Sequence, residues 1–311
     1  MEDLANGLRD VLGATSIAGL VRLSGGASRE TYRFDADGRA LILQRQRGGY
    51  ERDMAIEVAA LRAAAAGGVP VPHVIAASTD PSALGASFTI LTAVEGETIA
   101  RKILRDERFA TARAALAGQL GTAAARLHAV DPAGPVDFPV DDPLDGLRTT
   151  LDRSGEPHPA FELVFRWLQQ HLPAPRPQVL VHGDYRLGNL IVGDDGLRAV
   201  IDWELAHLGN PMEDLGYLCV KAWRFGATLP VGGVGSYHQL FEAYEAAGGG
   251  PVDPAEVHWW EVLGTLKWGI ICITQALAHT SGAARSHELA AIGRRVCENE
   301  HDLFLALEGH W

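Results

Sequence analysis

The first ninety residues alternate short apolar runs with turn residues, and one helical pattern interrupts them. Apolar residues recur every three or four positions from residue 53 to residue 66, which predicts a helix with one buried face. The other runs are short and bounded by Gly, Ser or Asp, as strands are. The predicted strands are 17–23, 31–34, 40–43 and 88–91.

Helical patterns replace this alternation after about residue 96. The predicted helices are 98–130, 161–171, 237–247, 256–279 and 285–307. A sheet-rich segment followed by a helix-rich segment is typical of an α+β fold. The sequence therefore predicts two lobes: a small N-terminal β-sheet lobe with one helix at 1–93, and a larger, mostly helical C-terminal lobe at 94–311.

The stretch 131–159 fits neither pattern, because it is rich in Pro, Asp and Gly. It is too long for a plain connection, and loops of such length often have a function. A solvated insertion without a role is an equally good interpretation.

Composition and charge limit the classes of protein that the chain can belong to. The formal charge is 27 minus 39, or −12, and such an acidic balance argues against a nucleic-acid-binding surface. The sequence contains no run of 18 apolar residues, so we expect no membrane span. The start MEDLANGLRD does not resemble a signal peptide. The three cysteines are widely spaced, so we expect them to be reduced and the protein to be cytoplasmic. No pattern predicts an oligomeric state.

The candidate chemistry lies in the segment HGDYRLGNLIVGDDGLRAVID, residues 182–202. Asp184 is followed by Asn189 five positions later and by Asp202 at the end of an apolar run. The runs 190–192 and 199–201, joined by the turn 194–196, predict a hairpin that brings Asn189 close to Asp202. Hard oxygen ligands of this kind suit Mg²⁺ on a nucleoside triphosphate, and Asp184 is placed to orient a hydroxyl nucleophile. The segment therefore predicts phosphoryl transfer.

Two other interpretations of these residues remain open. An isolated Asp or Asn beside a turn usually caps a helix or closes the turn, although three at this spacing favour chemistry. A metal-dependent hydrolase is the other, with His182, Asp184, Asp202 and His207 binding a transition metal that activates water.

The N-terminal lobe carries candidate phosphate contacts. A turn near residue 26 would let backbone N–H groups approach phosphates. Glu57, on the predicted helix, is placed to brace a cation on the preceding strand. That cation is ambiguous, since strand alternation puts Gln44 on one face and Arg45 on the other. Arg45 has the charge that could brace Glu57 bidentately, or it is a solvated strand end. The candidate turn residues are Gly25, Gly26 and Ser28.

Several further residues are expected to be structural. Asp214 is predicted to stabilise a loop or cap a helix. His182 is predicted to pack beneath the loop that carries Asp184 and Asn189, called the catalytic loop below, and to form hydrogen bonds with the backbone. The tryptophans Trp223, Trp259, Trp260 and Trp268 are predicted to lie in the core.

These motifs together resemble the aminoglycoside phosphotransferase family, a branch of the protein-kinase-like fold. HGDYRLGN followed by IDWE is the most specific part of the resemblance. The wording IDWELAHLGNP with LHAVD is most similar to kinase-like domains associated with acyl-CoA dehydrogenases. The remaining motifs are GGASRETYRF at 25–34, EVAALRAA at 57–64, GVPVP at 68–72 and GNPMEDLG at 209–216.

The resemblance implies a magnesium-dependent small-molecule kinase that uses ATP or GTP. It implies that Asp184 orients or deprotonates an acceptor hydroxyl, and that Asn189 and Asp202 hold Mg²⁺. The backbone at Thr92 and Val94 would pair with the nucleotide base. The acceptor is not legible, and a hydroxyacyl thioester is one candidate.

Gln44 departs from the family pattern, which usually has Lys or Arg there. This departure keeps open a nucleotide-binding pseudokinase with little activity.

Overall fold

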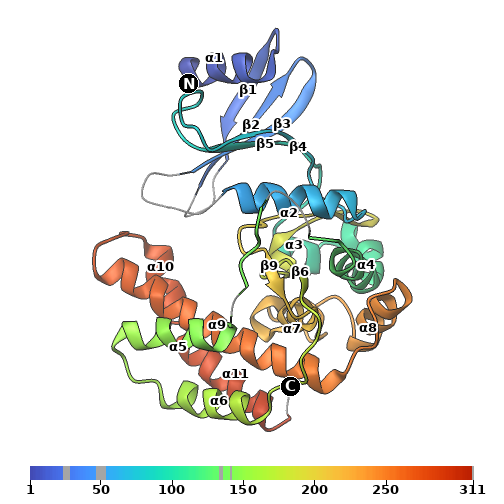
Figure 1. Ribbon diagram of the computed structural model, residues 1–311, viewed down its shortest axis with the longest axis vertical. Helices are drawn as coiled ribbons and strands as arrows, with labels where there is room; N and C mark the ends of the chain where they lie inside the picture. Colours follow the sequence, from blue (N-terminus) through green and yellow to red (C-terminus); the bar gives the residue numbers. More distant parts are fainter. Residues whose placement is uncertain (24–28, 47–53, 133–135, 141, 310–311) are drawn as a thin grey trace.

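The computed structural model describes residues 1–311 except 24–28, 47–53, 133–135, 141 and 310–311. A five-stranded antiparallel sheet forms the smaller, N-terminal part of the molecule, and helices form most of the larger part (Figure 1). The order of the strands in the sheet is β1-β2-β3-β5-β4. This arrangement confirms the predicted fold class. The strands are β1 (Ile17–Arg22), β2 (Arg29–Ala36), β3 (Arg39–Gln46), β4 (Val74–Ser78) and β5 (Phe88–Thr92).

The sheet is covered on both faces, which fixes where each of its side chains points. Helix α1 (Glu2–Leu12), which the sequence patterns did not predict, packs on the outer face with its buried Leu8. Leu41 and Leu43 of β3 belong to this outer core. Ile42 packs instead against the core shared with the helical part, on the side of α2 (Met54–Ala66). Residues on β2 and β3 that follow the alternation of Ile42 therefore face the helical lobe.

The main core lies in the helical part around α4 and α9, which carry many of its buried apolar residues. No described helix is long and apolar enough to cross a bilayer. The predicted helix 98–130 is divided at residues 106–109, and 285–307 is divided at residues 294–295. The helices are α3 (Ala100–Arg105), η1 (Glu107–Phe109), α4 (Ala110–His128), α5 (Pro143–Ser154), α6 (Pro159–Gln170), α7 (Met212–Cys219), η3 (Lys221–Arg224), α8 (Tyr237–Ala246), α9 (Pro254–Thr280), α10 (His287–Gly293) and α11 (Val296–Leu307).

Helix α5 corrects the view of 131–159 as a stretch without regular structure. Asp142 caps this helix by accepting hydrogen bonds from the N–H groups of Leu144 and Asp145, and Pro143 stands at its first position. Asp at the N-cap and Pro at the next position are standard helix-start signals. Helix α5 packs against α9 and so forms part of the helical lobe.

Short strands within the helical lobe form the predicted hairpin. Strand β7 (Leu190–Gly193) pairs with β8 (Gly196–Val200), while β6 (Val179–Val181) pairs with β9 (His207–Gly209). Two backbone hydrogen bonds join Glu97 and Val192, and the N–H of Val200 donates to the carbonyl of Pro70 at 2.8 Å. The hairpin is thereby tied to segments on both sides of the sheet lobe's boundary. The boundary at residue 93 itself stays a prediction.

Candidate active site

Asp214 of α7 accepts hydrogen bonds from the backbone of the loop between β6 and β7. Its carboxylate accepts the N–H of His182 at 2.8 Å and the N–H of Gly183 at 3.0 Å, and His128 lies 3.2 Å away. Burial disfavours the charge of this fully buried carboxylate, but the interaction with His128 and the backbone donors outweigh burial and lower its pKa. Gly183 has φ of 76°, and an added Cβ would lie 2.5 Å from the carbonyl oxygen of Leu205. Asp214 has the loop-stabilising contacts that the sequence predicted.

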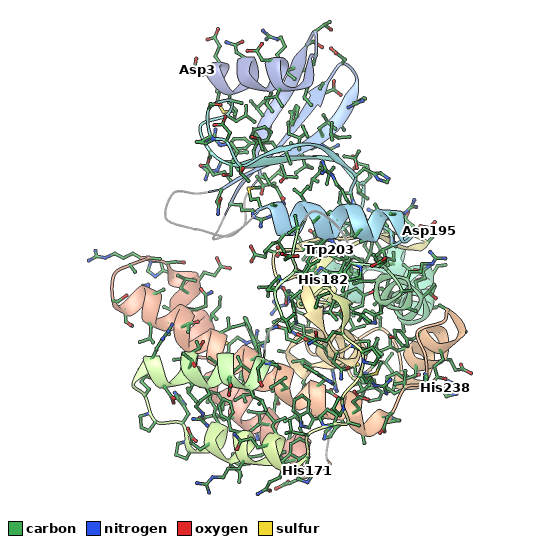
Figure 2. The ribbon with its side chains drawn as sticks, viewed as in Figure 1. Asp3, His171, His182, Asp195, Trp203 and His238 are labelled. Atoms are coloured by element: carbon green, nitrogen blue, oxygen red, sulfur yellow. The ribbon has the colours of Figure 1, made fainter. Side chains whose placement is uncertain are left out.

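His182 connects the two halves of the motif. Its Nε2 lies 3.0 Å from the carbonyl oxygen of Ile201, the residue before Asp202, and its Nδ1 lies 3.2 Å from the N–H of Asp184. Figure 2 shows His182 and Trp203 next to one another beneath α2, and their ring centroids are 4.7 Å apart. Burial lowers the pKa of His182 and so favours the neutral ring. The ring links the loop at Asp184 to the loop at Ile201 by hydrogen bonds. The predicted structural role of His182 agrees with these contacts.

Asp184 and Asn189 contact one another directly. The Nδ2 of Asn189 donates to the Asp184 carboxylate at 2.6 Å and to its backbone carbonyl at 3.0 Å. The Nε of Arg186 also donates to both carboxylate oxygens of Asp184, at 3.0 and 3.1 Å. The Arg186 guanidinium lies over the ring of Trp223, 4.6 Å from its centroid. The carboxylate of Asp184 is therefore held in one orientation by side chains on two sides.

Asp202 completes the set and is under electrostatic and conformational strain. Desolvation by the surrounding protein, followed by the neighbouring charges of Glu204 and Asp184, raises its pKa to about 6, although part of the residue stays exposed to solvent. Its φ of 68° lies in the left-handed region, which is costly for most residues with a side chain. Strain of this kind, together with excess negative charge, is common where a cation or ligand is held.

The donor set fits Mg²⁺ better than a transition metal. Asn189 and Asp202 supply an amide and a carboxylate oxygen, and magnesium usually takes one or two protein carboxylates and completes its shell with phosphates and water. Both ring nitrogens of His182 and of His207 already have partners within the protein. In the described part of the chain, no group of three His, Cys, Asp or Glu residues could hold a metal ion. These contacts argue against the metal-dependent hydrolase.

Opposite this set, a buried ion pair joins β2 to α2. The Nη1 of Arg29 donates to Oε1 of Glu57 at 2.7 Å, and Nη2 lies 2.6 Å from Oε2. Nη2 also lies 3.5 Å from Glu204, and Nη1 lies 3.4 Å from the amide oxygen of Gln44. The bracing of Glu57 by Arg45 that the sequence offered is wrong, because Arg45 pairs with Glu30 at 3.2 Å. Sequence reasoning missed Arg29, although its place in GGASRETYRF, two residues before the predicted strand, could have drawn attention to it.

The other predicted nucleotide contacts are the glycine turn near residue 26 and the backbone at Thr92 and Val94. Gly25, Gly26 and Ser28 lie outside the described residues. The N–H of Thr92 donates to the carbonyl of His73, so this amide is used within the sheet rather than for a base. Thr92 is the last residue of β5, and Val94 lies in the connection from β5 to α3.

A cavity of about 310 Å³ lies next to the catalytic loop, between α5, α7 and α9. Lys267 on its wall donates from Nζ to the carbonyl of Gly183 at 2.9 Å, and it lies over the ring of Tyr217. Burial lowers the pKa of His207, but its hydrogen bond to Glu213 outweighs burial and raises the pKa above its usual value. The cavity thus combines charged groups of both signs with apolar walls, since Glu213 lies 3.8 Å from Lys267 and Asp142 also lines it. Its apolar lining includes Pro143, Leu147, Trp260 and Leu263.

Comparison with known protein families gives one match that covers most of the chain. The model described as "Phosphotransferase enzyme family" matches residues 19–260. Acyl-CoA dehydrogenase family member 10 of Mus musculus is 29% identical over 248 residues, which are 72% of this chain and 22% of that protein. The probable acyl-CoA dehydrogenase IBR3 of Arabidopsis thaliana is 33% identical over 175 residues, 49% of this chain and 20% of that protein. The chain therefore spans about a fifth of the length of these relatives.

Solved structures share the fold over nearly the whole chain. A putative aminoglycoside phosphotransferase from Ralstonia eutropha JMP134 superimposes with a TM-score of 0.77 at 23% identity, covering 99% of this chain and 98% of that one. A thermostable mutant of aminoglycoside phosphotransferase APH(4)-Ia, in a ternary complex with AMP-PNP and hygromycin B, gives a TM-score of 0.64 at 15% identity, covering 97% and 99%. At these identities the likeness shows the fold. Both comparisons agree with the resemblance that the motifs indicated.

Proposed function

We propose that this chain, which belongs to the phosphotransferase enzyme family, is a small-molecule kinase that transfers the γ-phosphoryl group of ATP or GTP to an acceptor hydroxyl. The observation that carries the proposal is the convergence of Asp184, Asn189 and Asp202. Asn189 bonds the Asp184 carboxylate directly, and the charge of Asp184 helps to raise the pKa of Asp202. A carboxylate for the nucleophile beside two oxygen ligands for a cation is the arrangement that phosphoryl transfer requires.

In the proposed reaction, Asp184 orients the acceptor hydroxyl and takes its proton as the oxygen bonds to the γ-phosphorus. The bond from that phosphorus to the β–γ bridging oxygen breaks, and the nucleoside diphosphate leaves. Asn189 and Asp202 would hold Mg²⁺, which neutralises charge on the phosphates when bound. Arg186 and Asn189 keep the Asp184 carboxylate from rotating before an acceptor arrives.

For the acceptor, we propose the cavity beside the catalytic loop and a hydroxyacyl thioester as its occupant. The cavity size of about 310 Å³ suits an acyl chain rather than a whole coenzyme. Apolar walls at Leu147 and Leu263 suit a hydrocarbon chain, and Lys267 offers a cation for a carbonyl or carboxylate oxygen. The names of the curated relatives, which refer to acyl-CoA, also support this class. A cytoplasmic location is part of the same proposal.

A screen for nucleotide consumption tests the proposal. Purified protein is offered Mg²⁺ with ATP or GTP and hydroxyacyl thioesters, aminoglycosides, choline-like alcohols or sugars. Asp184→Asn removes the carboxylate charge and is expected to lower kcat by about 100-fold or more while nucleotide binding is kept. The matched control is Asp194→Asn, at a carboxylate in the exposed β7–β8 turn whose side chain is 68% exposed. The proposal fails if every acceptor gives the same rate with the native protein as with Asp184→Asn.

A further inference from the structure

The structure points to Arg29 on β2 as the phosphate-contacting cation of this protein, in place of a cation at Gln44 on β3. This inference rests on the proposed kinase function. Gln44 on β3 has no charge for the expected phosphate contact, and the inference assigns that contact to Arg29. It also removes the reason for regarding the chain as an inactive kinase, since the cation is supplied by the neighbouring strand.

The antiparallel register brings the two strands together at the right place. Thr31 is paired with Gln44, and Arg29 is paired with Gln46, so all four side chains emerge on the same face of the sheet. This is the face of Ile42, which packs toward the helical lobe. The Arg29 guanidinium comes within 3.4 Å of the Gln44 amide oxygen. A charge on β2 thus occupies the space next to the position where a β3 cation would stand.

The partners of Arg29 are those that a phosphate clamp needs. Glu57 of α2 holds the guanidinium from behind with both carboxylate oxygens, and the pair is buried, with 9% and 4% of the two side chains exposed. Arginine is suited to this bidentate arrangement and keeps further N–H donors for other partners. A braced, desolvated guanidinium is pre-organised to receive an anion without first losing its own orientation.

The second carboxylate near Arg29 marks where an anion would bind. Glu204 lies 3.5 Å from Nη2, which is long for a charged hydrogen bond, and it belongs to the same IDWE turn as Asp202. The side chain of Glu204 is 22% exposed and that of Glu57 is 4% exposed, so Glu204 is the partner of Arg29 that lies nearer to solvent. We infer that a phosphate oxygen of the nucleotide replaces Glu204 as the partner of Nη2, while Glu57 keeps its contact.

Two other arginines of these strands, Arg33 and Arg45, are directed elsewhere. Arg45 pairs with Glu30 on the face of the sheet that α1 covers. Arg33 lies on the same face as Arg29 but pairs with Glu95, and 46% of its side chain is exposed. Neither is close to Glu57 by any contact that the structure describes.

Nucleotide binding by calorimetry tests the inference with Mg²⁺-ATP, Mg²⁺-ADP and adenosine as probes. Arg29→Gln is expected to weaken binding of both phosphate-bearing probes by about 10- to 100-fold, the usual effect of losing a charged hydrogen bond, and to leave adenosine binding unchanged. Arg33→Gln, which removes the same charge from the same strand, is expected to bind all three as the native protein does. The double variant Arg29→Gln/Gln44→Arg is expected to recover at least part of the lost affinity, because it returns a cation to β3.

A second pair of variants guards against misfolding, since Arg29→Gln leaves Glu57 buried without its cation. Glu57→Gln keeps Arg29, and Arg29→Gln/Glu57→Gln removes both charges. Arg29→Gln/Glu57→Gln is expected to bind Mg²⁺-ATP at least tenfold more weakly than Glu57→Gln does. The inference is overturned if Glu57→Gln and Arg29→Gln/Glu57→Gln bind Mg²⁺-ATP equally. It is also overturned if Arg45→Gln weakens Mg²⁺-ATP binding and Arg29→Gln does not. A native protein that binds no nucleotide would overturn the kinase function as well, so the two failures are distinguishable.

Discussion

Replacing Asp202 by Asn should make the protein more stable while it abolishes phosphoryl transfer. The pKa of Asp202 rises from an ordinary 3.8 to about 6 because surrounding protein desolvates the carboxylate and because Glu204 and Asp184 add negative charge, although part of the residue stays exposed to solvent. Each pKa unit corresponds to about 1.4 kcal/mol, but Asp202 keeps exposed surface and solvent screens its charge, so the ionised side chain costs the folded state only about 1 kcal/mol at pH 8. Asn has nearly the same shape as the neutral acid and tolerates the left-handed backbone at this position well. The variant should therefore recover most of that free energy.

The sign of the pH dependence makes this prediction specific. A carboxyl whose folded pKa is raised stabilises the fold at low pH, and this contribution is lost as the pH rises through about 6. The advantage of Asp202→Asn should thus be full at pH 8, decline between pH 6 and pH 4 and vanish only below the unfolded-state pKa of 3.8. An advantage that stayed the same from pH 8 to pH 4 would show that a different interaction is responsible.

Urea and thermal unfolding in EDTA provide the measurement, at pH 8, 6 and 4. We expect the melting temperature of Asp202→Asn at pH 8 to rise by roughly 2 °C. The matched control is Asp195→Asn, at a carboxylate in the β7–β8 turn that is 73% exposed, where the effect should stay within about 0.5 kcal/mol. With Mg²⁺ and ATP added, the native protein and Asp195→Asn should gain stability and Asp202→Asn should not, because Asp202→Asn lacks the carboxylate for the metal. A variant that is no more stable than the native protein at pH 8 refutes the reasoning.

Two further predictions concern the support of the catalytic loop and the acceptor cavity. Asp214→Asn removes the buried charge that accepts the N–H groups of His182 and Gly183, and it should cost about 3–5 kcal/mol in urea unfolding; a loss below 1 kcal/mol would contradict the structural role. Lys267→Met should raise the KM of the acceptor about tenfold and change nucleotide affinity less than twofold in steady-state kinetics. A fall in kcat at unchanged acceptor KM would instead mean that Lys267 only positions the loop through Gly183.

Local patterns were sufficient for much of the fold and for the centre of the site. The spacing of Asp184 and Asn189 and the hairpin that leads to Asp202 follow from short-range alternation and turn chemistry. Most strands and long helices appear where periodicity predicts them. Helix α5 was missed because the richness of 131–159 in Pro and Gly outweighed a good start signal at Asp142 and Pro143. That signal was in the sequence, so local reasoning could have found this helix.

The cation opposite the catalytic loop is different, because only the tertiary structure decides it. Strand alternation separates Gln44 from Arg45, yet it cannot say which neighbour supplies a charge to Glu57. Arg29 lies 28 positions before Glu57 and 175 positions before Glu204, and the three meet only because β2 pairs with β3 and α2 packs under the sheet. The raised pKa of Asp202 has the same origin, since it depends on burial and on charges from separate segments. The sequence by itself determined which residues could carry out the chemistry, whereas packing between distant segments determined their partners and charges, because electrostatic energies depend on distances in space.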